Sequence, residues 1–163
     1  MKKTLTILAL IIAAATLSAQ TPKNVVYTFT EASDLNLIGK IIENTPNPYH
    51  RVDTVKYKGF TKGENSQVRS SAGLAVLFKT NSSVISVLTD FGYMNKGVNT
   101  MGVSLRGYDL YIKKDGEWLY AASKAGAVGK EEENLVLIKD MDGSMKECML
   151  YLPIYSEEYS VKI

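Results

Sequence analysis

The chain has 163 residues, 45% of them hydrophobic, and its 19 Lys and Arg nearly balance its 17 Asp and Glu. This near-neutral chain has no basic block, so we expect neither a nucleic-acid footprint nor attraction to an anionic membrane surface. Cys148 is the only cysteine, which excludes an internal disulfide and a thiolate metal cluster. Its apolar strand predicts a buried, inert thiol.

The first 19 residues have the pattern of a secretory signal peptide. Lys2 and Lys3 precede an apolar run over residues 5–15, and the small residues Ser18 and Ala19 follow it. The run is shorter than the roughly 20 residues of a bilayer-spanning helix, so we favour cleavage after Ala19 over an N-terminal membrane anchor. Removing the two lysines leaves 17 basic against 17 acidic residues. We therefore expect a neutral, exported protein, either periplasmic or extracellular.

The clearest local pattern is a β-hairpin over residues 107–122. Apolar and polar residues alternate through GYDLYIKK, as in a strand with one buried face. The Asp-Gly pair at 115–116 supplies the positive φ angles of a tight turn. On the return strand, we expect Trp118, Tyr120 and Ala122 to share one face.

Further short strands are expected before and after this hairpin. They are residues 25–29, 37–42 (broken by Gly39), 52–57, 73–80, 84–89, 135–138, 148–152 and 159–163. Asn81 and Ser82 predict a turn that joins 73–80 and 84–89 as a second hairpin. Loops are expected at 44–48, 58–67, 90–100 and 123–133.

Roughly ten short strands without a sustained helical period predict an all-β fold, an antiparallel β-sandwich or jelly roll behind the cleaved signal peptide. We expect a signal peptide at 1–19, a lead-in and first strand at 20–31, and the domain proper at 32–163.

Catalytic motifs are scarce in the chain. Serine-type hydrolysis needs a nucleophile, a base and an orienting carboxylate, but His50 is the only histidine and no Gly-x-Ser-x-Gly turn occurs. Asp140, Asp142 and Ser144 resemble the start of a calcium loop that lacks its later ligands, so a hairpin turn explains them better. We expect no metal and no cofactor.

The remaining candidates for ligand binding are aromatic and loop residues. Tyr49 and Tyr93 lie in predicted loops, where they are the tyrosines least easily explained as core. With His50 and Arg51 they form a set of weak binding candidates. The alternative is that such tyrosines pack between sheets and keep the hydroxyl at the edge.

Several stretches resemble the N-terminal β-sandwich domain of SGNH-hydrolase-type esterases. The sequence GYDLYIKKDGEW is similar to its Gly-x-Asp-Leu-Tyr motif, and LIGK, ENTPNPYHRV, SSAGLAVLFKTNSSVISV and CMLYLPIYSEEYSVKI are similar to other segments in the same order. The resemblance covers residues 32–163. Within the motif we expect structural roles for Gly107, Asp109, Leu110 and Tyr111, with Leu110 pointing inward, Asp109 bonded to a neighbouring loop and Tyr111 covering a sheet edge. The alternative is that Asp109 and Tyr111, on the face opposite Leu110, face substrate at the interface with the family's hydrolase domain.

The resemblance also implies which residues would carry catalysis, and they are not found here. The family's hydrolase domain follows this domain and uses a Gly-Asp-Ser or Gly-Ser-Ser turn and a late Asp-x-x-His. In this chain Arg69 precedes the Ser-Ser pair, Gly143-Ser144 runs into Met145, and the only tetrad ending in His begins with Asn47. No catalytic residue is carried over.

Three functions remain open from the sequence. The first is a non-catalytic accessory domain of an exported SGNH-type esterase, truncated or split from a hydrolase domain that acts on acyl esters such as acetylated glycans. The second is a stand-alone carbohydrate-binding module, which predicts coplanar exposed aromatic rings. The third is an enzyme that uses His50, which requires a Ser or Thr within hydrogen-bond reach of its ring.

Overall fold

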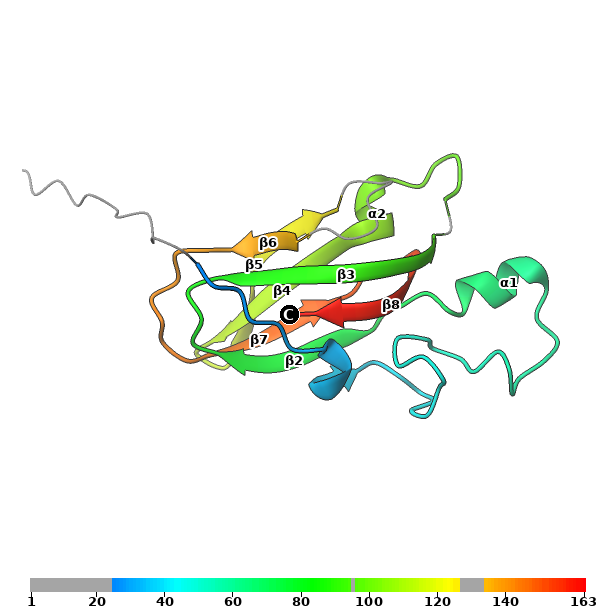
Figure 1. Cartoon of the computed structure of the whole chain (residues 1–163), viewed down its shortest axis with the longest axis horizontal. Helices are drawn as coiled ribbons and strands as arrows, with labels where there is room; N and C mark the ends of the chain where they lie inside the picture. The colour runs from blue at the N-terminus through cyan, green and yellow to red at the C-terminus, as the bar shows by residue number, and fades with distance from the viewer. Residues whose placement is uncertain (1–24, 95, 127–133) are drawn as a thin grey trace, which may run out of the picture.

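A computed structural model describes residues 25–94, 96–126 and 134–163, which form two antiparallel sheets (Figure 1). The five-stranded sheet has the order β1 (Asn36–Ile38), β2 (Ala75–Thr80), β7 (Lys146–Tyr151), β4 (Gly107–Lys114) and β5 (Glu117–Ala125). The three-stranded sheet has the order β6 (Asn134–Ile138), β3 (Ile85–Met94) and β8 (Ser156–Lys162). Three short helices are η1 (Ala32–Asp34), α1 (Lys62–Gln67) and α2 (Gly102–Arg106). The prediction of an all-β, antiparallel fold is confirmed.

Both sheets contribute side chains to one core. Val76, Leu110 and Leu150 come from the five-stranded sheet, and Val87 and Val161 come from the three-stranded sheet. All five are fully buried, and burial of such a side chain contributes about 1.5–3 kcal/mol.

Cys148 belongs to the same core and is a buried free thiol, as predicted. Burial raises the pKa of this thiol to about 11, so it is protonated and unreactive at neutral pH.

The predicted hairpin is present as β4 and β5. Asp115 and Gly116 have φ values of 53° and 89°, as a tight hairpin turn requires. The pairing shifts register between Leu110, which faces Ala122, and Tyr111, which faces Tyr120. This β-bulge places Ala122 against the core while Tyr120 stays on the outer face, so the prediction that Trp118, Tyr120 and Ala122 share a face is wrong.

The second predicted hairpin does not form. β2 pairs with β1 and β7, whereas β3 pairs with β6 and β8, so residues 81–84 carry the chain from one sheet to the other. A turn signal between two strands therefore specified a reversal of direction but not the pairing partner.

Other local expectations also differ from the structure. Residues 25–30 form no strand, although Thr30 exchanges two backbone hydrogen bonds with Ile163, and β1 ends at Ile38. Residues 52–57 form turns rather than a strand. The predicted loop 58–67 contains α1, whose start is fixed by a reciprocal capping box between Thr61 and Glu64. The signal peptide at 1–19 and the first residues of the lead-in lie outside the described residues.

The free edge of β8 is covered by side chains from the N-terminal part of the chain. Asn47 Nδ2 donates to the Glu158 carbonyl over 2.8 Å, and Val161 N donates to the Glu31 carboxylate over 3.0 Å. These bonds satisfy backbone groups that an edge strand would otherwise leave open for pairing with another chain.

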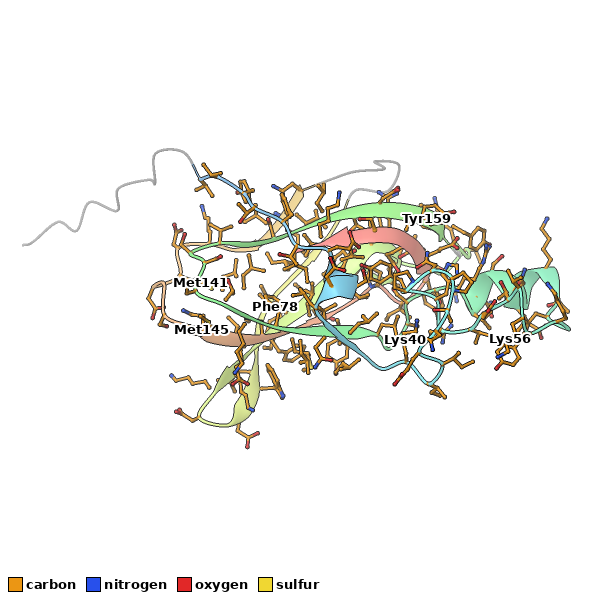
Figure 2. The ribbon with its side chains drawn as sticks, turned by 60° about the horizontal axis from the view of Figure 1, so that its bottom comes forward. Lys40, Lys56, Phe78, Met141, Met145 and Tyr159 are labelled. Carbon is orange, nitrogen blue, oxygen red and sulfur yellow. The ribbon has the colours of Figure 1, made fainter. Side chains whose placement is uncertain are left out.

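Loops and α1 extend beyond the sheets at one end of the molecule, past the end of β3, whereas α2 lies above β3, nearer the middle (Figure 1). In Figure 2 this end carries Lys40 and Lys56, while Met141 and Met145 lie at the opposite end, on the side where the β4–β5 hairpin projects. In the ranges that the structure describes, no helix has the length and apolarity needed to span a bilayer.

Candidate functional site

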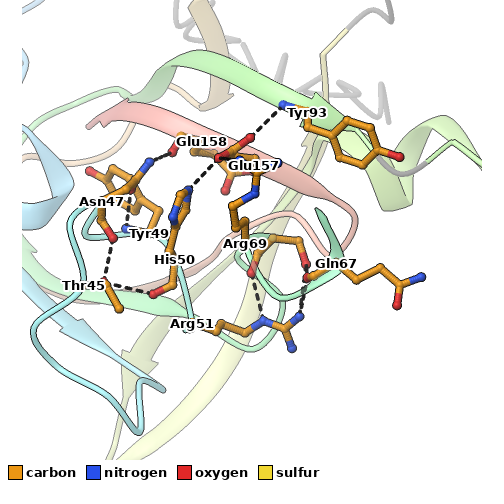
Figure 3. A network of polar contacts seen from close by, with 11 residues as sticks. Thr45, Asn47, Tyr49, His50, Arg51, Gln67, Arg69, Tyr93, Glu157 and Glu158 are labelled. Atoms are coloured by element: carbon orange, nitrogen blue, oxygen red, sulfur yellow. Dashed lines mark hydrogen bonds and ion pairs between the residues drawn. The ribbon is translucent and has the colours of Figure 1, made fainter. Parts of the chain in front are cut away.

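The loop-rich end brings the four predicted binding residues into one polar network. Tyr49, His50 and Arg51 come from a Pro-containing loop, and Tyr93 comes from the end of β3 (Figure 3). Two of them, His50 and Tyr93, bind Glu157, which sequence reasoning did not single out. Consecutive glutamates at 157–158 were a partial signal, because alternation in a strand turns one of two neighbouring side chains inward, whereas here both are buried.

Tyr49 belongs to the core although it lies in a loop. Its side chain is fully buried, its hydroxyl donates to the Glu31 carboxylate, and it accepts from Ser33 N over 3.1 Å. Burial, reinforced by Glu31, raises the pKa of this phenol well above its usual value. The interpretation of Tyr49 as a residue outside the core is wrong, because Glu31 at the edge of β8 offers its hydroxyl a partner. Its ring is closed to stacking on a ligand.

His50 forms an ion-pair cluster with Glu157 and Arg69. The His50 Nε2 atom lies 2.7 Å from Glu157 Oε1, and Arg69 lies 3.5 Å from the same oxygen. Tyr93 N donates to the second carboxylate oxygen over 3.2 Å. The Glu157 side chain is only 2% exposed, so one buried carboxylate joins three separate segments.

The electrostatics of the cluster favour a neutral imidazole. Burial lowers the pKa of His50 below its usual 6.5, and the neighbouring Glu157 carboxylate only partly opposes this effect. Within the described part of the chain, the hydrogen bond of the His50 ring goes to Glu157 and to no hydroxyl. A hydrolytic base would need a Ser or Thr at that distance.

Arg51 and Tyr93 take part in hydrogen bonds that involve backbone groups at the same end of the molecule. The Arg51 guanidinium donates to the carbonyls of Gln67 and Ser70 over 2.7 and 2.9 Å, at the C-terminal end of α1. Basic groups commonly satisfy the free carbonyls at such a helix end. Tyr93 contributes its backbone N–H, and its side chain is 46% exposed. The Tyr93 ring is the member of the set that faces solvent.

A second buried carboxylate, Glu158, lies beside this network. It is fully buried, it accepts from Ser156 Oγ, and its other oxygen lacks a hydrogen-bond partner in the described residues. Burial raises the pKa of Glu158 to about 8. No group of three or more His, Cys, Asp or Glu side chains in the described residues is arranged to hold a metal ion.

The residues of the predicted motif occupy three different environments. A Cβ added at Gly107 would lie 2.3 Å from the carbonyl oxygen of Val103 in α2, so only glycine fits this turn from helix to strand. Leu110 is fully buried in the core. Tyr111 packs edge-on against other rings on the outer face. Asp109 is exposed, and among the described residues its carboxylate accepts no hydrogen bond from a neighbouring loop.

Comparison with known proteins shows the family to which the chain belongs. Residues 26–163 match the family profile GxDLY, described as the N-terminus of SGNH-hydrolase-type esterases. The chain belongs to this GxDLY family. No curated protein matches it. The fold is similar to that of a candidate GDSL-like lipase from Bacteroides ovatus, with a TM-score of 0.76 and 37% sequence identity.

The match with the lipase covers unequal shares of the two chains. It covers 83% of this chain but only 39% of the lipase chain. The chain thus spans about two fifths of the solved protein that it matches. In the GxDLY family this part precedes an SGNH-type esterase domain, as the family description states.

Proposed function

We propose that this GxDLY domain is a non-catalytic accessory domain of an exported SGNH-type esterase. Its role is to scaffold a hydrolase domain that acts on acyl esters such as acetylated glycans. The observation that carries the proposal is the family match over residues 26–163, together with a structural relative of which this chain corresponds to 39%. We further infer that the two sheets pack as a jelly-roll-like β-sandwich, since their inner faces share one core.

The polar network supports a scaffolding role. Glu157 binds His50, Arg69 and Tyr93 N, and Arg51 binds the end of α1, so these side chains hold loops of their own domain. A carboxylate that is 2% exposed and shared in this way stabilises a fixed loop arrangement.

An ester-hydrolysis assay tests the non-catalytic assignment. Purified residues 20–163 are expected to hydrolyse generic acyl esters no faster than buffer. Turnover that disappears in His50→Ala would contradict the proposal and favour an enzyme based on His50.

A stand-alone carbohydrate-binding module is the second candidate, favoured by exposed tyrosines on the five-stranded sheet. Tyr120 and Tyr151 are 60% and 39% exposed. Both rings, however, meet the Tyr111 ring at 77°, so the three rings together do not form one coplanar platform of the kind that stacks on a sugar chain. Binding of acetylated xylan to residues 20–163 would favour this alternative.

A further inference from the structure

The outer face of the five-stranded sheet carries a compact aromatic cluster. In the pairing register, Tyr111 lies opposite Tyr120 on β5 and opposite Met149 on β7, while Asp109 lies opposite Tyr151. The Tyr111 ring contacts the rings of Tyr120 and Tyr151 at centroid distances of 5.9 and 5.8 Å. We call Asp109, Tyr111, Tyr120, Met149 and Tyr151 the motif face, because it contains the Asp and Tyr of the GxDLY motif.

The motif face leaves large apolar side chains in water. Tyr120 and Tyr151 keep 60% and 39% of their surface exposed, although each could bury far more under a neighbouring domain. The Tyr120 hydroxyl donates to Ser123 Oγ over 2.9 Å, which fixes the orientation of the most exposed ring. An oriented aromatic cluster of this kind is typical of the centre of a protein interface.

Asp109 is the motif residue whose side chain makes no hydrogen bond or ion pair with the described residues of its own domain. Gly107 is needed for the close approach to α2, Leu110 fills the core, and Tyr111 joins the aromatic cluster. The Asp109 carboxylate lies at the rim of that cluster without a donor among the described residues. A carboxylate in this position offers two acceptor oxygens to an N–H or a guanidinium approaching the sheet.

We propose that the motif face binds the SGNH-type hydrolase domain, with Tyr120 and Tyr151 buried at the contact and Asp109 accepting a hydrogen bond from a basic or backbone N–H group of that domain. The inference rests on the proposed function and adds the surface through which the scaffold acts. A hydrolase domain is the expected partner of the motif face, because about three fifths of the matched lipase lies outside the part that this chain covers. Because Tyr111 meets both neighbouring rings edge-on, the cluster as a whole is uneven and suits a protein surface better than a flat sugar.

Tyrosine footprinting with hydroxyl radicals tests the surface directly. The probe is the part of the Bacteroides ovatus lipase outside the matched share, fused to the full chain. Tyr120 and Tyr151 are expected to react in the isolated chain and to become as unreactive in the fusion as the fully buried Tyr108. Tyr159 on β8 and Tyr57, which are 56% and 42% exposed, are the internal controls and are expected to react equally in both.

The other outcomes separate the inference from the proposed function. Protection of Tyr159 or Tyr57 alone would overturn the motif face as the docking surface but leave the scaffolding function standing. Equal reactivity of all four tyrosines would overturn both. Protection of Tyr120 and Tyr151 in the isolated chain by acetylated xylan would overturn the inference in favour of glycan binding. If the fusion does not fold, the same labelling is read on the chain mixed with the separately expressed hydrolase part.

A matched pair of carboxylate-to-amide substitutions tests Asp109. Asp109→Asn is expected to weaken association with the hydrolase part by about tenfold, the loss expected for one charge-assisted hydrogen bond. Asp90→Asn is the control, because Asp90 is also an exposed strand carboxylate but lies on β3 of the other sheet. Unchanged association for Asp109→Asn, or an equal loss for Asp90→Asn, would overturn the role of Asp109.

Discussion

Replacing Glu158 by glutamine is expected to make the domain less sensitive to alkaline pH. The side chain is fully buried and accepts a hydrogen bond from Ser156 Oγ, while its second oxygen lacks a partner in the described residues. Burial raises its pKa from 4.5 to about 8. The folded chain therefore holds a proton on Glu158 at neutral pH that the unfolded chain releases.

The sign of the effect follows from this proton. A group whose pKa is higher in the folded state adds stability below its unfolded pKa, and that stability is lost as the pH rises through the folded pKa. For a shift from 4.5 to about 8, linkage gives a loss of about 2.5 kcal/mol between roughly pH 5.5 and pH 7.5. At roughly 4 °C per kcal/mol for a domain of this size, the loss corresponds to about 10 °C in melting temperature.

Thermal unfolding of wild type and Glu158→Gln across this pH range measures the effect. Glutamine cannot ionise and keeps an oxygen for the Ser156 hydroxyl. The melting temperature of Glu158→Gln is therefore expected to rise relative to that of the wild type as the pH increases. Glu117→Gln, at an exposed position in β5, is the control and is expected to follow the wild type. Parallel curves for Glu158→Gln and wild type would refute the buried, protonated carboxyl.

Three further substitutions test the packing and the network, with free energies of unfolding measured by urea denaturation. Gly107→Ala is expected to cost about 1–3 kcal/mol, because its Cβ meets a backbone carbonyl at 2.3 Å, whereas Gly63→Ala in α1 meets no atom within 4 Å and is expected to be neutral or stabilising. Equal effects of the two would contradict the close approach. Glu31→Gln is expected to cost about 1.5–3 kcal/mol through weaker bonds to Tyr49 and to the edge of β8, and an unchanged stability would contradict that clamp. His50→Ala is expected to cost about 1–3 kcal/mol and to remove part of the stability loss below pH 6.5, since burial lowers the pKa of this imidazole in the folded state. A variant as sensitive to acid as the wild type would show that His50 is not the group responsible.

The sequence predicted those parts of the fold that depend on neighbouring residues. The β4–β5 hairpin followed from alternation and from the positive φ preference at 115–116. The capping box of α1, between Thr61 and Glu64, is equally local and was readable, but a Gly-containing polar stretch was interpreted as loop. The sheet in which β3 lies was not readable, because it depends on packing between segments far apart in the chain.

The candidate site shows the same limit. Tyr49, His50, Arg51 and Tyr93 were singled out as loop residues, and the structure brings them to one end of the molecule. Only His50 and the backbone N–H of Tyr93 bind Glu157, a partner that no local pattern connects to them. The burial of Tyr49 could not be predicted from its Pro-rich neighbourhood, since it depends on an acceptor on Glu31. Whether any of these residues binds a ligand stays a prediction.

The distribution of carboxylates separates the internal framework of the domain from its outward surface. Glu31 and Glu157 each accept hydrogen bonds or ion pairs from more than one segment, and Glu158 is buried beside them. Burying such groups is costly, and they are retained where they fix one arrangement of loops. Asp109 differs from all three, because it lies in the family motif, is exposed and has no partner among the described residues. A motif residue without a partner among the described residues is the one on which the proposed contact with a hydrolase domain would depend.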